Sequence, residues 1–292
     1  MAQQTVVLVT GASSGIGMAI VKELAADEMR VFAGMRDVTG RNAGAVTELG
    51  AYPNLTAVDL DVTSDASVIA AVAQVLREAG HIDVLINCAG ITGTGVAEAF
   101  SVAQFETILQ TNLVGPFRLM KAVLPGMRAR RDGLIVSISS IGGRNVIPGS
   151  GLYCASKFGI EALAEAVGYE ASIHGVDWAV IQPGPFGTNL AVSSLNAADQ
   201  AVEADYGVTA AEFRRRMTEA TIAALSTSGC STDPRDVAKA ISVLIRLPKG
   251  KRPKRQAIGL DHGTNAMNAD IAGHQRRFIE AIDMNDLEPA GG

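Results

Sequence analysis

One stretch near the start of the chain restricts the possible folds more than any other. Residues 5–10 read TVVLVT, an apolar and mostly β-branched run that is typical of a strand buried on both faces of a parallel sheet. The glycine-rich turn GASSGIG follows at 11–17, and the segment MAIVKELAADE after it shows helical periodicity. Because strand, glycine turn and helix in this order form the first half of a βαβ unit, the sequence predicts an α/β fold.

The glycine turn also predicts a binding site for an anion. Gly11 permits the tight turn, Gly15 lets the backbone approach a pyrophosphate, and Gly17 allows the helix to pack closely on the strand. The N–H groups at the start of the helix point toward the same place. A plain β-to-α turn is the alternative that the sequence alone leaves open. The residues of this turn that we expect to contact a dinucleotide are Gly11, Ser13, Ser14, Gly15, Ile16 and Gly17.

The alternation of strands and helices continues without a break to about residue 262. We therefore expect a single α/β domain over residues 1–262, built around parallel strands. The segment 186–230 is weakly patterned, which is typical of a substrate-binding loop or lid. Residues 263–292 are expected to form a tail with one helix, HQRRFIEAID.

The end of the second expected strand bears on which dinucleotide is bound. An acidic residue at this position accepts hydrogen bonds from the 2′-hydroxyl of the ribose, whereas an arginine accommodates a 2′-phosphate. The segment RVFAGMRDV places Met35 and Arg36 at the strand end, which favours NADP(H) over NAD(H). A shift of one residue would place Asp37 there instead, so NAD(H) stays open as the alternative.

Two later strand ends supply further candidates for contacts with the cofactor. The strand NLTAVDLDV closes on Asp61 and Val62, and the Asp61 carboxylate could accept the adenine amino group. A turn or helix-entry aspartate is the equally good alternative for Asp61. The strand IDVLINCAG runs into a loop of small residues, in which Asn87, Ala89 and Gly90 could pass close under the cofactor.

Residues 139–157, SSIGGRNVIPGSGLYCASK, carry the candidate chemistry. Tyr153 and Lys157 stand one helical turn apart at the start of an expected helix, so both side chains project from one face. A free phenol has a pKa of about 10, and moving it three units toward neutrality takes about 4 kcal/mol. A cation about 4 Å away, at an effective dielectric constant of about 20, supplies that amount before desolvation. The pair is therefore sufficient for proton transfer, although a Tyr and a Lys at this spacing are also common on ordinary amphipathic helices.

Two polar residues are candidates to complete this site. Ser140 ends the strand DGLIVSIS thirteen positions before Tyr153, and its hydroxyl could hold a substrate oxygen beside the phenol. Asn112 lies one turn before Pro116 in a long helical stretch. Because proline has no N–H and disturbs the preceding turn, backbone groups near Asn112 are freed and could hold a water. The alternative is that Asn112 only satisfies the kink.

Composition argues against several other classes of protein. The chain has 292 residues, 48% of them hydrophobic, which suffices for a large core. Its net charge of −5 does not suit nucleic-acid binding, and the one basic cluster, KGKRPKR at 249–255, is short. Three cysteines and four histidines show no metal-ligand spacing, so we expect neither a metal site nor a disulfide framework. No signal-peptide pattern or transmembrane-length apolar run is visible, which favours a cytoplasmic protein without an integral membrane segment.

Taken together, these motifs resemble those of the short-chain dehydrogenase/reductase family over about residues 5–262. The TGxxxGxG motif of the family stands at 10–17, and its NNAG motif appears as NCAG at 87–90, with Cys88 in place of the second asparagine. The remaining matches are the helix asparagine, the catalytic serine, the YxxxK motif and the PG motif with its threonine. They fall on Asn112, Ser140 rather than Ser139, Tyr153, Lys157, Pro183, Gly184 and Thr188.

The resemblance implies a doubly wound Rossmann-type fold of about seven parallel strands that oxidises an alcohol to a carbonyl reversibly with NAD(P). In such a mechanism Tyr153 donates the proton in reduction and accepts it in oxidation. Lys157 binds the nicotinamide ribose and lowers the pKa of Tyr153, Ser140 orients the substrate oxygen, and Asn112 holds a water in a proton relay. The resemblance also implies a homodimer or homotetramer formed through the long helices.

The leading hypothesis from the sequence is an NADP(H)-dependent oxidoreductase for a small, mostly apolar alcohol or ketone. The alternative is a dinucleotide-binding sensor or scaffold that keeps the fold without turnover. The intact set of candidate catalytic residues argues against this alternative, since a binding protein has no need of a tuned phenol.

Overall fold

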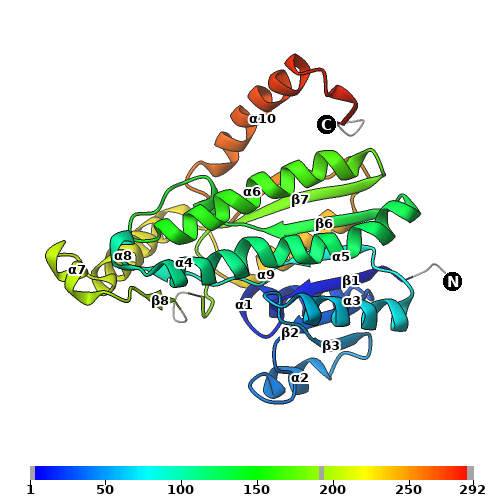
Figure 1. Ribbon diagram of the computed structural model, residues 1–292, viewed down its shortest axis with the longest axis horizontal. Helices are drawn as coiled ribbons and strands as arrows, with labels where there is room; N and C mark the ends of the chain where they lie inside the picture. The colour runs from blue at the N-terminus through cyan, green and yellow to red at the C-terminus, as the bar shows by residue number, and fades with distance from the viewer. Residues whose placement is uncertain (1–3, 191–193, 288–292) are drawn as a thin grey trace.

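A seven-stranded parallel sheet forms the centre of the molecule (Figure 1). The structure is a computed structural model that describes residues 4–190 and 194–287. Every pairing in this sheet is parallel, so the expected fold class is confirmed. The strands, in their order across the sheet, are β3 (Leu55–Asp59), β2 (Arg30–Met35), β1 (Val6–Thr10), β4 (Val84–Asn87), β6 (Gly133–Ile138), β7 (Val176–Pro183) and β9 (Arg255–Ile258).

The direction in which the chain adds strands reverses between β1 and β4. From β1 the chain moves outward to β2 and β3, then returns to place β4 on the other side of β1. Open α/β sheets bind ligands outside the carboxyl ends of the strands, at the point where this order reverses. Thr10 ends β1 and Asn87 ends β4, so the two loops at this point are the glycine turn and the NCAG loop.

Helices cover both faces of the sheet and produce two separate hydrophobic cores. Along β1 the side chains alternate, with Val7 and Val9 in one core and Val6 and Leu8 in the other. The first core contains residues of α1 (Gly15–Ala26), α2 (Ala43–Leu49) and α9 (Pro234–Arg246). The second contains residues of α3 (Asp65–Ala79), α5 (Gly115–Arg130) and α6 (Gly151–Ser172).

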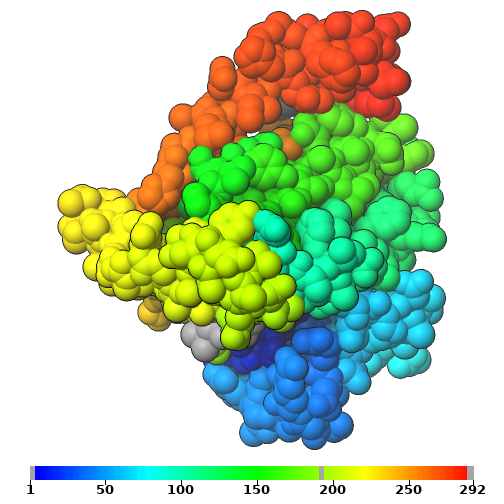
Figure 2. All heavy atoms as spheres, turned by 60° about the vertical axis from the view of Figure 1, so that its left-hand side comes forward, coloured from blue at the N-terminus to red at the C-terminus, as the bar shows by residue number. Residues whose placement is uncertain are grey.

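Within the segment 186–230, residues 194–230 contain more regular structure than the weak sequence pattern predicted. It contains the short strand β8 (Leu195–Asn196), which pairs in parallel with β5 (Gly93–Thr94), and the helices α7 (Gln200–Asp205) and α8 (Ala210–Ser228). Figure 2 shows this segment, coloured yellow-green to yellow, protruding from the molecule.

The sequence pattern did not reveal α8 because this helix has no apolar stripe. Ala210 is its only buried residue. Its ends are instead fixed by Thr209, whose hydroxyl accepts from the Glu212 N–H, and by Gly229 in the left-handed conformation at φ +67°. Arg215 pairs with Glu212 and Glu219 on its exposed face.

The tail also differs from its expected form. The helix α10 (Thr264–Ala281) begins ten residues before the expected segment, and a short 3-10 turn, Asn285–Leu287, follows it. The helix extends away from the sheet at the end of the chain (Figure 1). Its start is fixed by the Asp261 carboxylate, which accepts hydrogen bonds from the backbone N–H groups of Gly263 and Asn265.

Candidate active site

The glycine turn after β1 has the geometry that a phosphate cradle needs. Gly11 and Gly15 both have positive φ, +70° and +55°, which favours glycine. A Cβ on Gly11 would lie 2.7 Å from the Cα of Ala89, and one on Gly17 would lie 2.2 Å from the Gly11 oxygen. No side chain caps the start of α1, since Ser14 makes no capping hydrogen bond. The turn can therefore present backbone N–H groups at close range to an anion.

The segment that follows β7 comes close to this glycine turn. A Cβ on Gly15 would lie 3.2 Å from the Cβ of Thr188, so these two residues are in contact although far apart in sequence. The Gly184 N–H donates to the Ile258 oxygen at 2.9 Å. A Cβ on Gly184 would lie 2.2 Å from the Leu260 oxygen. Glycine after Pro183 thus lets the chain pass close to the backbone that follows β9.

The NCAG loop is held against the end of β1. The Thr10 hydroxyl accepts hydrogen bonds from the N–H groups of Cys88 at 3.0 Å and Ala89 at 3.1 Å. The Asn87 side chain is 3% exposed, and neither its oxygen nor its nitrogen has a hydrogen-bond partner among the described residues. Buried amides are seldom left unsatisfied, so Asn87 has the free donor and acceptor that suit a dinucleotide at this edge.

The exposed Arg36 directly follows β2, as the sequence predicted for an NADP(H) site. Asp37 does not compete for this position, because its carboxylate closes its own turn by accepting from Gly40 N at 3.0 Å and Arg41 N at 2.8 Å. The sequence reasoning did not single out Arg41, a second exposed cation in the connection between β2 and α2. The only sequence feature that could have indicated Arg41 was its position as a basic residue five positions after Arg36.

The Asp61 carboxylate closes a local turn, which is the alternative that the sequence left open. It accepts from the backbone N–H of Thr63 at 2.9 Å and from the Thr63 hydroxyl at 2.7 Å. Burial raises the pKa of Asp61, but these hydrogen bonds and the charges of Arg36 and Arg118 lower it further than burial raises it. Val62 beside it is buried under Gly115. Contact of Asp61 and Val62 with an adenine stays a prediction.

The Tyr153 ring and the Ser140 hydroxyl meet at Gly142, where a Cβ would lie 3.4 Å from both Ser140 Oγ and Tyr153 Cε1. Both side chains are buried, and Ser140 Oγ also accepts from the Gly142 N–H at 3.0 Å. Ser139 lies on the other side of the loop, where a Cβ on Gly143 would be 2.5 Å from its Oγ. The structure therefore places Ser140, and not Ser139, beside the phenol.

Lys157 lies one turn further along α6, with its ammonium directed to the sheet. Its Nζ donates to the Ile138 oxygen at 2.9 Å and lies 5.6 Å from the centre of the Tyr153 ring. Burial lowers the pKa of Lys157 to about 8, against the nearby Cys88 and Glu161, which raise it. Lys157 is therefore mostly protonated at neutral pH.

The expectation that Lys157 brings the pKa of Tyr153 toward neutrality is not met in this structure. Burial raises the pKa of Tyr153 to about 12, and only the hydrogen bond with Ser140 opposes it. The lysine is bonded to a backbone carbonyl, and burial outweighs its charge because the phenol is enclosed. Tyr153 is accordingly a protonated phenol at neutral pH.

Asn112 lies in a π-helical turn, Gln110–Val114, between α4 (Val102–Leu109) and α5. Pro116 has no N–H to donate to the Asn112 carbonyl, which accounts for the irregular turn. The Asn112 amide accepts from Ile91 N at 2.9 Å and donates to Ile91 O at 2.8 Å and Ser156 Oγ at 2.9 Å. The side chain thus joins the loop after β4 to α6, and these three bonds go to Ile91 and Ser156 rather than to the backbone of the kink. The backbone carbonyl is left as the place where Asn112 could hold a water, a role that stays a prediction.

Gly90 lies where the two halves of the site meet. A Cβ on this residue would be 3.5 Å from the Asn112 oxygen and 3.8 Å from Lys157 Nζ. The fold thus brings the predicted residues of the NCAG loop, the π-helical turn and α6 to one point at the carboxyl edge of the sheet.

A family model described as short chain dehydrogenase matches residues 5–199. This chain belongs to that family. The solved structure of a short-chain dehydrogenase from Streptomyces avermitilis superimposes with a TM-score of 0.75 at 30% identity, over 97% of this chain and 98% of that one. A variant of the actinorhodin polyketide ketoreductase, solved with NADPH, gives a TM-score of 0.74 at 30% identity, over 89% and 97% of the two chains.

The curated relatives that this chain matches are named reductases and dehydrogenases. A 3-ketodihydrosphingosine reductase of Bacteroides thetaiotaomicron is 37% identical over 188 residues, 64% of this chain and 66% of that protein. Retinol dehydrogenase 8 of Homo sapiens is 38% identical over 190 residues, 63% and 60% of the two chains. The 17-beta-hydroxysteroid dehydrogenase type 1 of Homo sapiens is 35% identical over 206 residues, 68% and 62%. The chain thus spans less than two thirds of the length of these relatives.

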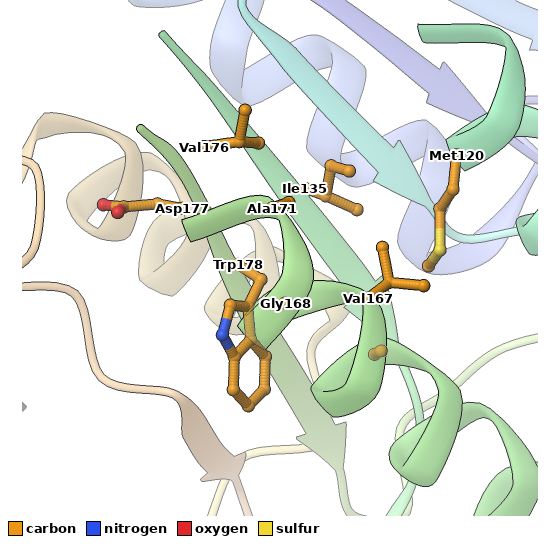
Figure 3. A pocket seen from close by; sticks show the side chains of 9 residues that line it. Met120, Ile135, Val167, Gly168, Ala171, Val176, Asp177 and Trp178 are labelled. Atoms are coloured by element: carbon orange, nitrogen blue, oxygen red, sulfur yellow. The ribbon is translucent and has the colours of Figure 1, made fainter. Parts of the chain in front are cut away.

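A second pocket lies away from the candidate active site around Tyr153. Figure 3 shows its lining between α5, α6, β6 and β7. Val176 in this lining is the first residue of β7, at the opposite edge of the sheet from Tyr153. The ring of Trp178 packs on α6 where a Cβ on Gly168 would lie 2.2 Å away. The lining is mostly apolar, so we interpret this pocket as a feature of packing.

The basic residues of the cluster at 249–255 largely form ion pairs with acidic residues of the same chain. Arg252 pairs with the buried Asp177 at 2.7 Å, Arg255 pairs with Glu161 at 2.8 Å, and Lys249 lies 3.3 Å from Asp132. Within residues 4–190 and 194–287, no group of three or more His, Cys, Asp or Glu side chains could hold a metal ion. Over the same residues, no helix has the length and apolar content needed to cross a membrane.

Proposed function

We propose that this short-chain dehydrogenase interconverts a secondary alcohol and a carbonyl on a small, mostly apolar substrate, with NADP(H) as the hydride carrier. The observation that carries the proposal is that the Tyr153 ring and Ser140 Oγ meet at Gly142, with Lys157 Nζ 5.6 Å from the centre of the ring at the carboxyl edge of the sheet. A phenol enclosed beside a hydroxyl and an ammonium has the groups that proton transfer to a carbonyl oxygen needs.

The site suits NADP(H) in three respects. The glycine turn presents backbone at close range, Asn87 offers an unpartnered buried amide, and the exposed Arg36 follows β2. The actinorhodin ketoreductase, at 30% identity, was solved with NADPH. When bound, the nicotinamide supplies or accepts the hydride. The other residues that would hold the dinucleotide are those of the turn at 11–17, Ala89, Gly90, Lys157, Gly184 and Thr188.

Residues of the protein transfer the proton and stabilise the phenolate that forms. In reduction, the Tyr153 hydroxyl donates its proton to the carbonyl oxygen, which Ser140 holds by a hydrogen bond. With a pKa raised to about 12, Tyr153 carries that proton at neutral pH. The Lys157 ammonium then stabilises the phenolate that remains. A water on the Asn112 carbonyl returns the proton from solvent.

In oxidation the roles reverse, and Tyr153 accepts the proton of the alcohol. A phenol of raised pKa is rarely ionised at neutral pH. We therefore expect reduction to be the faster direction at neutral pH, and oxidation to gain rate as the pH rises.

The names of the relatives support an alcohol or ketone on an apolar skeleton as substrate. They specify 3-ketodihydrosphingosine, retinol and a 17-beta-hydroxysteroid. In this chain the loop between Ser140 and Tyr153 carries Ile147 and Pro148. Phe213 of α8 packs on Gly149 of the same loop, where a Cβ would lie 2.5 Å from the ring. The segment 186–230 therefore has an apolar contact with the loop beside the phenol, which suits a lid over an apolar substrate.

The proposal is tested with the purified chain and a panel of apolar ketones and alcohols, each assayed with NADPH and NADH. We expect reduction of at least one class of ketone with NADPH, and less with NADH. Tight NADPH binding without turnover of any compound would favour the sensor or scaffold instead.

A further inference from the structure

One buried acidic side chain has an oxygen without a partner inside the protein. Glu203 lies in α7 and is 8% exposed. Its Oε1 is enclosed and accepts no hydrogen bond from any described residue. Burial of a carboxyl oxygen without a partner is costly, because the group loses its water and gains no hydrogen bond in return. Such a group in a folded protein therefore indicates a partner that comes from outside the chain.

Glu203 lies against the segment that connects β5 to α4. A Cβ on Gly95 would be 2.6 Å from Glu203 Oε1, 3.2 Å from the Cβ of Ala197 and 3.3 Å from Cε2 of Phe100. Gly95 has no side chain, so the carboxylate can approach the backbone there. The groups that meet the carboxylate at this point are thus a bare backbone, a methyl group and a ring, which donate no hydrogen bond to it.

The loop beside the phenol reaches the same point. The Gly95 N–H donates to the Gly149 oxygen at 2.9 Å. Two residues earlier in that loop, Ile147 lies beside the phenol, since Ile147 Cδ1 and Tyr153 Cε1 both lie 3.4 Å from a Cβ placed on Gly142. A continuous series of contacts therefore joins the phenol to the carboxylate of α7.

The segment 186–230 supplies apolar groups around this path. The ring of Phe213 packs on Gly149, and the buried Ala197 lies beside Gly95. The helices α7 and α8 and the strand β8 lie together at one end of the molecule (Figure 1). Apolar surroundings with a few unpartnered polar atoms are typical of ligand sites, in which the polar atoms fix the orientation of the ligand.

We propose that Glu203 forms the far end of the substrate site and accepts a hydrogen bond from a hydroxyl or ammonium group at the end of the substrate remote from its carbonyl. The proposal rests on the proposed function and narrows its substrates to apolar ketones and alcohols that carry such a donor. The apolar part of the substrate lies along Ile147 and Phe213. A carboxylate accepts hydrogen bonds and does not donate them, so the group that it binds is a donor.

The attachment of α7 to the rest of the protein does not need this carboxylate. Asp199 caps the helix by accepting from the N–H groups of Ala201 and Val202. The Asp199 N–H donates to the Ala99 oxygen at 2.9 Å, and the Tyr206 hydroxyl donates to Glu98 Oε2 at 2.6 Å. An apolar side chain in place of the glutamate would fill the same space without the cost of burying a polar group. Packing of α7 therefore does not account for a glutamate at this position.

The test uses linear methyl ketones of graded chain length, each made with a terminal methyl, hydroxyl or amine group and assayed with NADPH. In the wild type we expect kcat/KM for the hydroxyl- or amine-ended ketone to exceed that for the methyl-ended ketone of the same length by about 10-fold or more at the best length. The graded lengths are needed because the donor must reach Glu203 while the carbonyl lies at Tyr153. No preference at any length overturns the proposal.

Variants of Glu203 assign the preference to this side chain. Glu203→Leu removes the acceptor, so we expect the preference to disappear. Glu203→Gln keeps an acceptor oxygen without the charge, so we expect the preference to fall for both donors, and further for the amine, which is protonated at neutral pH. The matched control is Asp205→Asn, which changes an exposed carboxylate of the same helix and should keep the wild-type preference. A wild-type preference in Glu203→Leu, or its loss in Asp205→Asn, overturns the proposal.

A purely structural role of the carboxylate gives another result. It predicts a lower melting temperature in Glu203→Leu and equal losses of kcat/KM for all three ketones of a set, so that their ratio does not change. We expect the ratio to change and the melting temperature to stay at or above that of the wild type. If Glu203→Leu does not fold, Glu203→Gln carries the test, and an unchanged ratio in that variant overturns the proposal.

Failure of the proposed function is distinguished by binding. If the wild type reduces no ketone of the series, the affinities of the same ketones for the NADPH-loaded chain are measured by titration calorimetry. Tighter binding of a donor-ended ketone in the wild type than in Glu203→Leu would overturn the reaction and leave the binding role of Glu203 standing. Equal binding in the two would overturn that role. A wild type that reduces all members of a set at the same rate would leave the reaction standing and overturn the role of Glu203.

Discussion

The Lys157 ammonium donates to the backbone oxygen of Ile138 at 2.9 Å, and this bond fixes the lysine against the sheet rather than against the phenol. Lys157 and Tyr153 are thus anchored to different strand-end groups, Ile138 and Ser140. The site holds a neutral phenol and a cation in one enclosure, which are the protonation states that the proposed reduction of a carbonyl uses.

Replacing Tyr153 by Phe removes the proton donor and leaves the ring. We expect turnover to fall by about 10² to 10⁴, with NADPH affinity nearly unchanged, since the ring still packs in the same place. Steady-state rates and NADPH titration measure the two quantities. A variant that keeps the wild-type rate would show that another group supplies the proton.

The two adjacent serines provide a matched pair of variants. Ser140→Ala removes the hydroxyl bonded to Tyr153, and we expect kcat to fall by about 10² or more, as for loss of one donor to a reacting oxygen. Ser139→Ala removes a buried hydroxyl that has no hydrogen-bond partner among the described residues, so we expect little change in kcat. Equal losses in both variants would contradict the assignment of Ser140.

The choice of cofactor is tested at the end of β2. Arg36→Ala should weaken NADPH binding by about 10-fold or more, because a hydrogen bond to a charged group contributes about 1.5 to 3 kcal/mol, while NADH binding changes little. The control Asp37→Asn keeps an oxygen that can close the turn with Gly40 and should leave both affinities near wild type. Equal losses of both cofactors in Arg36→Ala would mean that this residue does not contact a 2′-phosphate.

The lowered pKa of Lys157 predicts how stability depends on pH. The folded pKa is about 8 and the ordinary value is 10.5, so between these values the unfolded chain binds a proton that the folded chain does not. Stability therefore rises with pH across this window and is lost as the pH falls through 8, by up to about 3 kcal/mol. Unfolding of the wild type and Lys157→Met, followed by Trp178 fluorescence at several pH values, isolates this contribution. A difference in stability between the two that stays constant as the pH rises above 8 would contradict it.

The attachment of α10 predicts a specific loss of stability. Asn268→Leu removes the amide that bonds Gln182 Oε1 at 2.6 Å and Arg144 Nε at 3.2 Å, and leaves these two groups with Glu161 as a remaining partner. We expect the free energy of unfolding to fall by about 1 to 3 kcal/mol. The exposed Arg276 on the same helix is the control, and Arg276→Ala should change it by less than about 0.5 kcal/mol. Chemical denaturation measures both, and similar effects would show that these hydrogen bonds do not hold the helix.

The sequence was sufficient to predict the features that depend on local spacing. The glycine turn and the spacing of Tyr153 and Lys157 rest on residues whose positions a single turn or helix determines, whereas the choice of Ser140 came from its thirteen-residue spacing to Tyr153 in the family resemblance. The irregularity at Asn112 follows from Pro116 for the same reason. In each case the physical cause lies within a few residues of its effect.

Features that depend on distant segments were not visible in the sequence. Glu161, Gln182 and Asn268 come from α6, β7 and α10, and no spacing connects them. The predicted direction of the Tyr153 pKa shift was wrong, because the charge of Lys157 can be read from the sequence whereas the burial of the phenol cannot. The helix α8 was missed because its ends are set by capping and ion pairs, and not by an apolar stripe.

The π-helical turn at 110–114 holds one residue more than a regular helical turn. This extra residue changes the phase between α4 and α5, since each residue of a regular helix advances the side-chain direction by about 100°. The apolar residues of α5 can therefore face the sheet while the Asn112 amide faces the NCAG loop. Deleting one residue from this turn would restore a continuous helix and force a choice between those two orientations, so the alignment of the site with the core depends on a single inserted peptide unit.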